Sequence, residues 1–478
     1  MEIREPLGRS SRRAHRRQFL VRGRPRRVAE RQDCRLGLMG RKLAVLLQDQ
    51  RAGTINRAKP IPVSMFSFLL VPGLVAMTAL ADWPQWRGVG RDGHATSVGW
   101  EPSTLPKEAK AVWKVRVGPG HSSPIVFGNR VVYLDESEGQ EFVHCLDRNS
   151  GRSLWKSALS SSYQDEWGAG PRSTPFVDAD RVYAQSCNGE FRCLSLEQGR
   201  TIWRVNFEDF GVKFLGSKAQ EGTASRRGNT GSGLIDGPRV IVPVGSTSQG
   251  TLFCFDKLTG KVLWKALRDE AAYSSPVLAS PGGIRQVIHL TAEGLAGVHA
   301  ETGEALWQVP LKTAAKRHAA TPVVYGNKIL VNSYSIGVVC IELAPRSGKM
   351  DATIAWQLKD QKINIASPVL VGQHLYSQGA NKDFVCVDVA AGALKWAQAG
   401  FGLGGKKDYS STIALGRRLL VLTEDGQLLL LDANPDQFRE LARLQVCGNT
   451  WSHPAYAGGR LYVRDGRELA CFDLRGTP

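Results

Sequence analysis

Short runs of apolar and β-branched residues, separated by polar turns, dominate the chain from residue 111 onward. Residues 174–205 show this pattern most clearly. Strands are predicted at 174–177, 181–184, 191–195 and 201–205. The turn before the third strand carries Asn188-Gly189, which is typical of a two-residue β-hairpin. Four short strands in about 45 residues, without a helical period, indicate one blade of a β-propeller.

A glycine followed four residues later by a tryptophan recurs along the same region. Five copies keep this spacing and end at Trp155, Trp203, Trp264, Trp307 and Trp396. A sixth copy reaches Trp356 with four extra residues after Gly348. Self-similarity at roughly 40–50 residues indicates a propeller or a solenoid. Because an aromatic on every fourth strand packs between neighbouring blades, we expect a structural docking role for these tryptophans and for Trp113.

The blade starts can be counted from a second repeated feature. Each predicted first strand follows a small hydroxyl residue, usually before proline, where no ladder donor is needed. The starts are Ser123-Pro124, Thr174-Pro175, Ser232-Gly233, Ser275-Pro276, Thr321-Pro322, Ser367-Pro368, Ser411-Thr412 and Ser452-His453-Pro454. The sequence therefore predicts an all-β, eight-bladed β-propeller of four-stranded antiparallel blades over residues 111–478.

The last blade lacks a fourth strand at the C-terminus, since only four residues follow Leu474. A matching run, AVWKVRV at 111–117, precedes the first blade and carries Trp113. We predict that this N-terminal strand pairs with the run 468–472 and closes the ring. Closure of this kind removes exposed sheet edges.

Most of the basic excess lies before the propeller. Of the net charge of +18, residues 1–64 carry +12, from 17 Lys and Arg against 5 Asp and Glu. They are interpreted as a basic leader or an over-extended gene start, so that the charge says little about partners of the propeller. No nucleic-acid motif stands out.

Residues 65–81 resemble the apolar part of a signal peptide, ending in Ala79-Leu80-Ala81 before Asp82. We expect cleavage near Ala81-Asp82, a periplasmic or secreted product without a transmembrane anchor, and an N-terminal extension at 82–110. A monomer is expected.

The nine cysteines follow the blade repeat rather than a disulfide pattern. Six of them occupy the same third-strand position: Cys145, Cys193, Cys254, Cys340, Cys386 and Cys471. Leu430 and Gly297 fill this position in the other two copies. A position shared by Cys, Leu and Gly is expected to be a tight buried site, with inert thiols and no metal.

The phrase FDKLTGKVLW, ending at Trp264, resembles the tryptophan-docking motif of the pyrroloquinoline-quinone-type (PQQ-type) propeller repeats. The resemblance covers residues 111–474 and implies the propeller fold. Members of this family include the propeller lipoprotein of outer-membrane protein assembly and the quinoprotein dehydrogenases. Residues 82–93, DWPQWRGVGRDG, resemble the segment that begins many exported propellers of this type.

Two departures bear on function. The dehydrogenases carry adjacent cysteines and a calcium site with a catalytic aspartate, and neither can be matched here; the lipoprotein's lipidated cysteine is also absent from the segment after Ala81. The chain is therefore expected to be a non-catalytic ligand- or protein-binding scaffold without a cofactor. The alternative is a PQQ-dependent dehydrogenase, holding PQQ with calcium and oxidising an alcohol or a sugar.

The loops before the blade starts converge near the axis of a propeller, and here they are rich in cations and aromatics. The candidate ligand-binding residues are His121, Arg172, Arg226, Arg227, Tyr273, Lys316, Arg317, His318, Asn364, Lys407, Asp408, Tyr409, Trp451 and His453. Such a mouth favours an anionic small molecule or an acidic peptide or protein. A long insertion at 206–231 is expected on the same face, as a binding loop or a flap.

Overall fold

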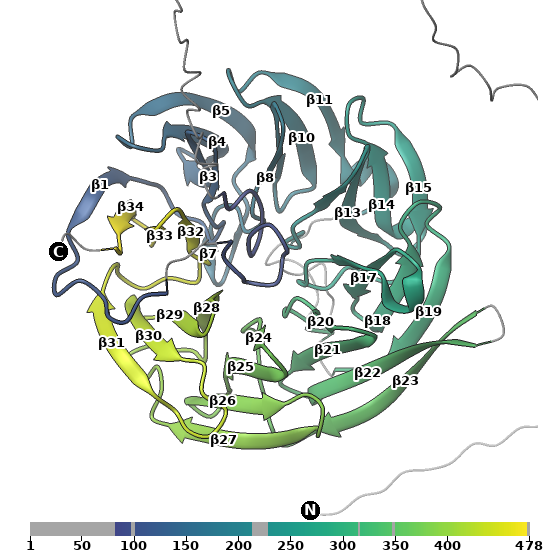
Figure 1. Cartoon of the computed structure of the whole chain (residues 1–478). Helices are drawn as coiled ribbons and strands as arrows, with labels where there is room; N and C mark the ends of the chain where they lie inside the picture. The colour runs from purple at the N-terminus through teal and green to yellow at the C-terminus, as the bar shows by residue number, and fades with distance from the viewer. Residues whose placement is uncertain (1–81, 97–100, 213–227, 314–315, 347–348, 476–478) are drawn as a thin grey trace, which may run out of the picture. The chain divides into compact units, whose positions relative to one another are not determined.

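The computed structural model describes residues 82–96, 101–212, 228–313, 316–346 and 349–475. In these residues eight four-stranded sheets stand around a common axis (Figure 1). Neighbouring strands within every sheet are antiparallel, and the short first strand lies innermost. The prediction of an eight-bladed β-propeller is confirmed.

The blades follow one another along the chain. Blade 1 has β2 (Ile125–Phe127), β3 (Arg130–Ser137), β4 (Gln140–Asp147) and β5 (Ser153–Ser161); blade 2 has β8 (Phe176–Asp178), β9 (Arg181–Gln185), β10 (Glu190–Ser195) and β11 (Thr201–Asn206); blade 3 has β12 (Leu234–Asp236), β13 (Arg239–Ser246), β14 (Gly250–Asp256) and β15 (Val262–Ala266); blade 4 has β16 (Val277–Ala279), β17 (Gln286–Leu290), β18 (Gly294–His299) and β19 (Ala305–Pro310).

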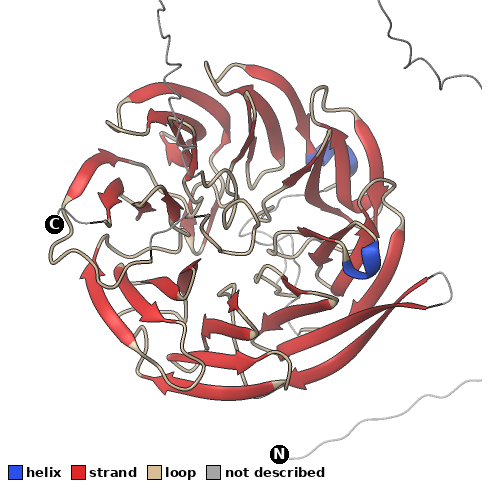
Figure 2. Ribbon diagram, viewed as in Figure 1, coloured by secondary structure: helices blue, strands red, loops and turns tan. Residues whose placement is uncertain are grey.

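Blade 5 has β20 (Val323–Tyr325), β21 (Lys328–Ser333), β22 (Gly337–Arg346) and β23 (Lys349–Leu358); blade 6 has β24 (Val369–Val371), β25 (His374–Gln378), β26 (Asp383–Asp388) and β27 (Ala393–Ala399); blade 7 has β28 (Ser410–Leu415), β29 (Arg418–Thr423), β30 (Gln427–Asp432) and β31 (Glu440–Gln445). Blade 8 combines β32 (Ala455–Ala457), β33 (Arg460–Arg464) and β34 (Glu468–Asp473) with β1 (Ala111–Arg116). A small hairpin, β6 (Gln164–Asp165) and β7 (Gly168–Ala169), precedes blade 2, and the 3-10 turns η1 (Phe207–Phe210) and η4 (Pro281–Gly283) are the helical elements in the described residues (Figure 2).

The ring closes through β1, as predicted. β1 lies antiparallel to β34, with Trp113 opposite Cys471 and Arg116 opposite Glu468. The first and last strands of the propeller therefore share blade 8, and no blade is left with an unpaired third strand.

The recurrent tryptophan and glycine meet across blade boundaries. The ring of Trp155 lies against Gly199 of the next blade, where an added Cβ would come within 2.4 Å of it. The indole Nε1 of Trp155 donates to Leu196 O at 2.9 Å. Because the glycine has φ of +68°, it satisfies both the turn and the close approach of the ring. Trp113, Trp203 and Trp356 make the same pair of contacts.

Trp307 is an exception that explains the glycine at its paired position. Its Nε1 donates within its own blade, to Gln286 Oε1 at 2.7 Å. Gly297 lies opposite Trp307, and a Cβ there would come within 2.3 Å of the indole nitrogen. The cysteine position is therefore glycine in blade 4, because the ring occupies the space that a thiol fills elsewhere. The six cysteines at this position in the other blades are free thiols with 0 % exposure.

Several expectations fall outside the described residues: the basic leader 1–64, the signal segment 65–81, Arg226 and Arg227, and most of the insertion 206–231. Of the extension 82–110, all but residues 97–100 are described. No helix in the described residues is both long and apolar enough to cross a membrane.

Candidate functional site

Residues 82–96, which we call the hub segment, lie at the centre of the ring (Figure 1). Trp83 forms an antiparallel bridge with Val126 of blade 1, and Ala95 N donates to Ala414 O of blade 7 at 2.9 Å. Between them, Val177 N of blade 2 donates to Pro84 O at 2.9 Å. The hub segment therefore pairs with the innermost strands and closes the channel.

Two arginines and a tryptophan of the hub segment reach four further blades. Arg91 Nε donates to Pro276 O of blade 4 at 2.9 Å, and its Nη1 donates to Gly233 O of blade 3 at 2.8 Å. Arg87 Nη2 donates to Pro368 O of blade 6 at 2.5 Å. Trp86 Nε1 donates to Thr321 Oγ1 of blade 5 at 2.8 Å. These partners are almost all backbone carbonyls. The acceptors that hold the hub segment are therefore present whatever the residue type at those positions.

The two guanidinium groups are buried, and neither forms an ion pair within 4.0 Å in the described residues, although the charge of Asp92 acts on Arg87. Arg87 is 1 % exposed, and its Nε and Nη1 have no hydrogen-bond partner among the described residues. Burial lowers the pKa of Arg87 to about 10 and that of Arg91 to about 9. Both remain cations at neutral pH, and the nearby Asp92 offsets part of this charge at Arg87.

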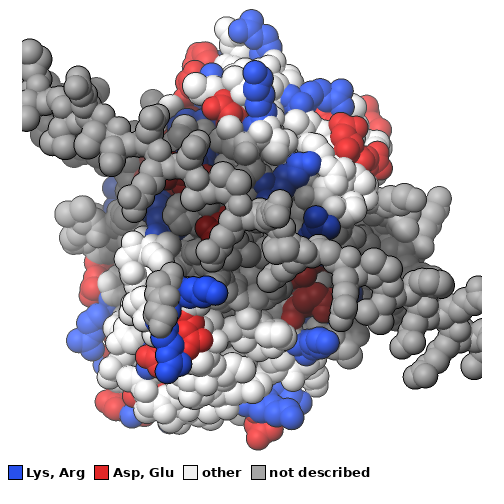
Figure 3. All heavy atoms as spheres, turned by 90° about the vertical axis from the view of Figure 1, so that its right-hand side faces the viewer, with Lys and Arg blue, Asp and Glu red and all other residues white. Residues whose placement is uncertain are grey.

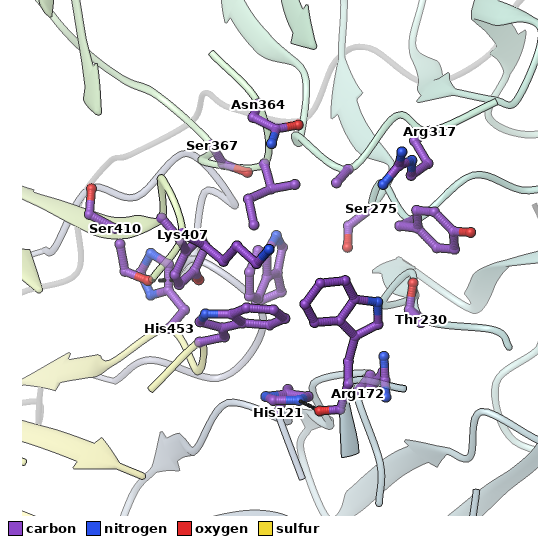
Figure 4. Close-up of a pocket in the computed structure, with 18 of the residues that line it drawn as sticks. His121, Arg172, Thr230, Ser275, Arg317, Asn364, Ser367, Lys407, Ser410 and His453 are labelled. Atoms are coloured by element: carbon purple, nitrogen blue, oxygen red, sulfur yellow. Dashed lines mark hydrogen bonds between the residues drawn. The ribbon is translucent and has the colours of Figure 1, made fainter. Parts of the chain in front are cut away.

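A cavity of about 320 Å³ lies above the hub segment, with Trp86 in its lining. Figure 4 shows Arg172, Arg317, Lys407 and Asn364 around it, each on a different loop. The structure places ten of the candidate residues in its lining: His121, Arg172, Tyr273, Arg317, Asn364, Lys407, Asp408, Tyr409, Trp451 and His453. The hub segment and the blade-start loops together thus define a funnel with a closed base.

Lys316 and His318 do not line this cavity, contrary to the expectation for their loop. Lys316 Nζ pairs with Glu293 at 3.0 Å and with Glu270 at 3.4 Å. His318 is 0 % exposed, and its Nε2 lies 2.7 Å from Leu311 O. Adjacent residues of one loop point in different directions, which leaves Arg317 as the loop's contribution to the cavity.

The rim of the cavity, where Arg172, Arg317 and Lys407 lie, carries less net positive charge than its sequence suggests. Arg172 Nη2 donates to Asp165 Oδ1 at 2.6 Å, so this cation is neutralised by a buried carboxylate from the β6–β7 hairpin. No carboxylate in the described residues pairs with Arg317 or with the ammonium of Lys407. The Lys407 Nζ lies 4.8 Å from the centroid of the Trp167 ring. Elsewhere, on the side of the ring turned toward the viewer in Figure 3, both signs of charge are interspersed.

The two histidines of the cavity add no charge at neutral pH. Burial, with the nearby Arg172, lowers the pKa of His121 to about 4. Burial, with the charge of Arg87, lowers the pKa of His453 to about 3. Burial also raises the pKa of Tyr409 to about 12, so its hydroxyl stays protonated.

Aromatic rings line much of the cavity, and two of them were not among the predicted residues. Trp167 comes from the β6–β7 hairpin and lies 5.3 Å from Trp451, which stacks on His121 at the same distance. Trp86 comes from the hub segment and meets His453 edge-on at 5.3 Å. Both tryptophans lie outside the docking repeat, and that departure is the signal that could have singled them out.

The hydroxyl residues at the blade starts form a chain of bonds around the channel. Ser232 Oγ accepts from Thr174 N at 2.9 Å, and Ser275 Oγ accepts from Ser232 N at 3.0 Å. Ser367 Oγ accepts from Thr321 N, and Ser123 Oγ accepts from His453 N, both at 3.0 Å. These four hydroxyls each accept from the preceding blade, which explains the serine at these four blade starts.

The buried Glu141, on which the charge of Arg172 acts, makes the stability of the fold depend on pH. Burial raises the pKa of Glu141 to about 7, although bonds from Ser186 and Tyr163 oppose the shift. The folded protein therefore keeps a proton that the unfolded chain releases near the usual pKa of 4.5. The contribution of Glu141 to stability is therefore largest below that value and falls as pH rises toward 7.

We expect Glu141→Gln to remove this decline and to raise the free energy of unfolding at pH 8 by about 1–3 kcal/mol. Urea unfolding across the pH range measures it. The exposed Glu304→Gln serves as the control and should keep the decline. An unchanged pH slope in Glu141→Gln would contradict the assignment.

The fold and the cavity define a tryptophan-docked, PQQ-type eight-bladed propeller with a closed axial funnel. The chain belongs to the family of the outer membrane protein assembly factor BamB, whose model matches residues 106–222 and 139–398. This finding agrees with the resemblance that the repeats carry.

Curated relatives support the same placement. The chain is 24 % identical over 270 residues to BamB of Bordetella pertussis, covering 55 % of this chain and 60 % of that protein. It is 27 % identical over 305 residues to BamB of Burkholderia pseudomallei, covering 60 % of this chain and 70 % of that protein. The chain thus spans less than two thirds of the length of the Bordetella protein.

Among solved structures, BamB from Moraxella catarrhalis matches with a TM-score of 0.50 and 15 % identity, over 77 % of this chain and 98 % of that one. The quinohemoprotein alcohol dehydrogenase from Comamonas testosteroni matches with a TM-score of 0.57 and 12 % identity, over 83 % and 81 %. At these identities the structural matches show the shared fold alone.

Proposed function

We propose that this protein is an exported, monomeric binding and scaffold module that takes an anionic ligand, or an acidic segment of a partner, into its axial cavity. The observation that carries the proposal is the closed funnel, whose lining includes the exposed cations Arg317 and Lys407 and the aromatic rings of Trp86, Trp167 and Trp451. Positive charge lining a concave, partly apolar site attracts anions more strongly than the same charge on an open surface.

The family supports the scaffold part of the proposal. The relatives carry the name outer membrane protein assembly factor, and we infer by analogy that this chain serves a protein assembly in the cell envelope. Export rests on the apolar segment 65–81 with its cleavage pattern at Ala81-Asp82. Both inferences are independent of the cavity.

The alternative, a PQQ-dependent dehydrogenase, fits this residue set in part. Tryptophan faces and rim cations suit the planar, carboxylated quinone. The described lining offers one carboxylate, Asp408, whereas calcium takes six to eight oxygen ligands. The described residues also contain no group of three or more His, Cys, Asp or Glu placed to hold a metal ion. The set does not fit the calcium of the quinoproteins, and we assign no oxidation step to the cavity.

Anion binding is tested by titrating the protein of residues 82–478 with three probes: hexaglutamate, pyrroloquinoline quinone and a galacturonate disaccharide. Because Trp86, Trp167 and Trp451 line the cavity, binding should change the tryptophan fluorescence. We expect at least one probe to bind and its affinity to fall with rising salt. The double change Arg317→Glu and Lys407→Glu should weaken it by about 10- to 100-fold.

A matched variant, Lys261→Glu with Lys395→Glu, makes the same charge change at exposed positions in blades 3 and 6, away from the cavity lining. It should bind as the parent does. Because Arg317 and Lys407 are exposed, their double variant should melt within about 2 °C of the parent. Failure of all three probes, or equal losses in the two double variants, would overturn the proposed function.

A further inference from the structure

We propose that the ligand of the axial cavity is an acidic sugar, a pyranose ring bearing one carboxylate or sulfate group. This inference rests on the proposed function, since it names the class of anion that the same cavity takes. It is carried by three features of the lining: hydroxyl groups with a proton still to donate, fixed aromatic faces, and an unpaired carboxylate oxygen beside the rim cations.

The first feature is a set of neutral hydroxyl groups arranged around the axis. Ser232 and Ser275 are 3 % and 4 % exposed, line the cavity and each accept one backbone N–H. A serine hydroxyl that accepts a bond can still donate its own proton, and no described residue accepts one from either. Thr230 and Ser410 also line the cavity, and their buried hydroxyl oxygens have no partner in the described residues. Sugar hydroxyls, which both donate and accept, complement such groups.

The second feature is the aromatic surface, whose orientation is fixed before a ligand arrives. Trp86 is held by its bond to Thr321, and Trp451 Nε1 donates to Glu424 Oε1 at 3.0 Å. Trp451 is also stacked on His121. The C–H face of a pyranose packs on such flat rings. Rings that are already fixed lose little conformational entropy on binding.

The third feature is the acid in the cavity. Asp408 Oδ2 is buried without a partner in the described residues, next to Lys407 in sequence. A polyanion, such as an acidic peptide, would place further carboxylates near it and would be repelled. A sugar with a single acid group can direct that group to Arg317 or Lys407 and donate a hydroxyl to Asp408. The mixed lining therefore favours an acidic sugar over an acidic peptide.

The closed base of the funnel adds a constraint on size. The hub segment prevents a chain from passing through the ring, so the ligand enters and leaves by the same mouth. A free sugar or the terminal residue of an acidic polysaccharide satisfies this geometry. The two sources share the same chemistry and are distinguished by comparing a disaccharide with a longer oligomer of the same sugar.

The test uses the protein of residues 82–478 with fluorescence titration and calorimetry. We expect a galacturonate disaccharide or a sulfated galactose disaccharide to bind, and the neutral galactose disaccharide to bind about tenfold more weakly or worse. Equal affinity for the disaccharide and a longer galacturonate oligomer indicates that one terminal ring is recognised. Loss of affinity with oligomer length indicates a free sugar.

Asp408→Asn separates the sugar from a peptide by the sign of its effect. For an acidic sugar we expect binding to weaken by about fivefold or more, because the charged acceptor is lost. For hexaglutamate the same change would strengthen binding, because repulsion is removed. Asp436→Asn, at an exposed position outside the cavity, is the matched control.

Three outcomes would overturn the inference: hexaglutamate binds and both acidic disaccharides fail, the neutral disaccharide binds as well as the acidic ones, or Asp408→Asn tightens the binding of an acidic disaccharide. In the first of these the proposed anion-binding function still stands. Failure of every probe, pyrroloquinoline quinone included, removes the proposed function itself.

Discussion

A chain that begins at residue 101 is expected to fold into a ring of clearly lower stability, by about 5–10 kcal/mol, because it lacks the hub segment. Loss of the buried Trp83 accounts for about 3–5 kcal/mol of this, as for other fully buried tryptophans. The rest comes from the backbone pairing with blades 1 and 7 and from the arginine bonds to blades 3, 4 and 6. Chemical unfolding of the two purified proteins measures the difference.

The point variant Trp83→Ala should account for about half of that loss while it leaves the chain length unchanged. Val89→Ser, at a 52 % exposed position of the same segment, is the control and should unfold as the parent does. If the chain from residue 101 unfolds at the same urea concentration as the parent, the prediction is wrong. The hydrogen bonds of the hub segment would then contribute no net stability.

A chain that begins at residue 118 should go further and lose its solubility as a monomer. It lacks β1 as well as the hub segment, so β34 becomes an edge strand with unpaired backbone groups. We expect oligomers or aggregates in size-exclusion chromatography, whereas the chain from residue 101 stays monomeric. The comparison of these two chains isolates the contribution of β1.

A synthetic peptide of residues 108–118 should restore the monomer by adding the missing strand. The same peptide with Trp113→Ala should fail, because Trp113 is 8 % exposed and its indole bonds Arg148 O at 2.9 Å. A monomeric chain from residue 118 without peptide would show that closure by β1 is dispensable for solubility.

The sequence predicts the ring well because its signals are periodic. Trp, Gly and the blade-start hydroxyl residues each have a structural reason that repeats in blade after blade, such as the contact of Trp155 with Gly199. Closure by β1, the strand that carries Trp113, follows from counting strands. The last blade has three strands at the C-terminal end, and one further strand precedes the first blade.

The cavity is predicted less completely because its chemistry depends on contacts that do not repeat. Arg172 is neutralised by Asp165 from a short hairpin, and Lys316 turns away toward Glu293. The hub segment has no period, and Arg91 bonds backbone carbonyls that no side chain marks. Local sequence places such residues on the correct face but does not fix which way each side chain points.

The hub segment also imposes an order on assembly. It is among the first parts of the propeller to be synthesised, yet Trp83 stacks on His453 of the last blade. β1 likewise cannot pair until β34, near the other end of the chain, has been synthesised. A nascent chain stopped before blade 8 would therefore leave β1 without its partner strand and Trp83 without the ring of His453. The ring can therefore close only after blade 8 has been synthesised, because β1 and Trp83 both need residues of that blade.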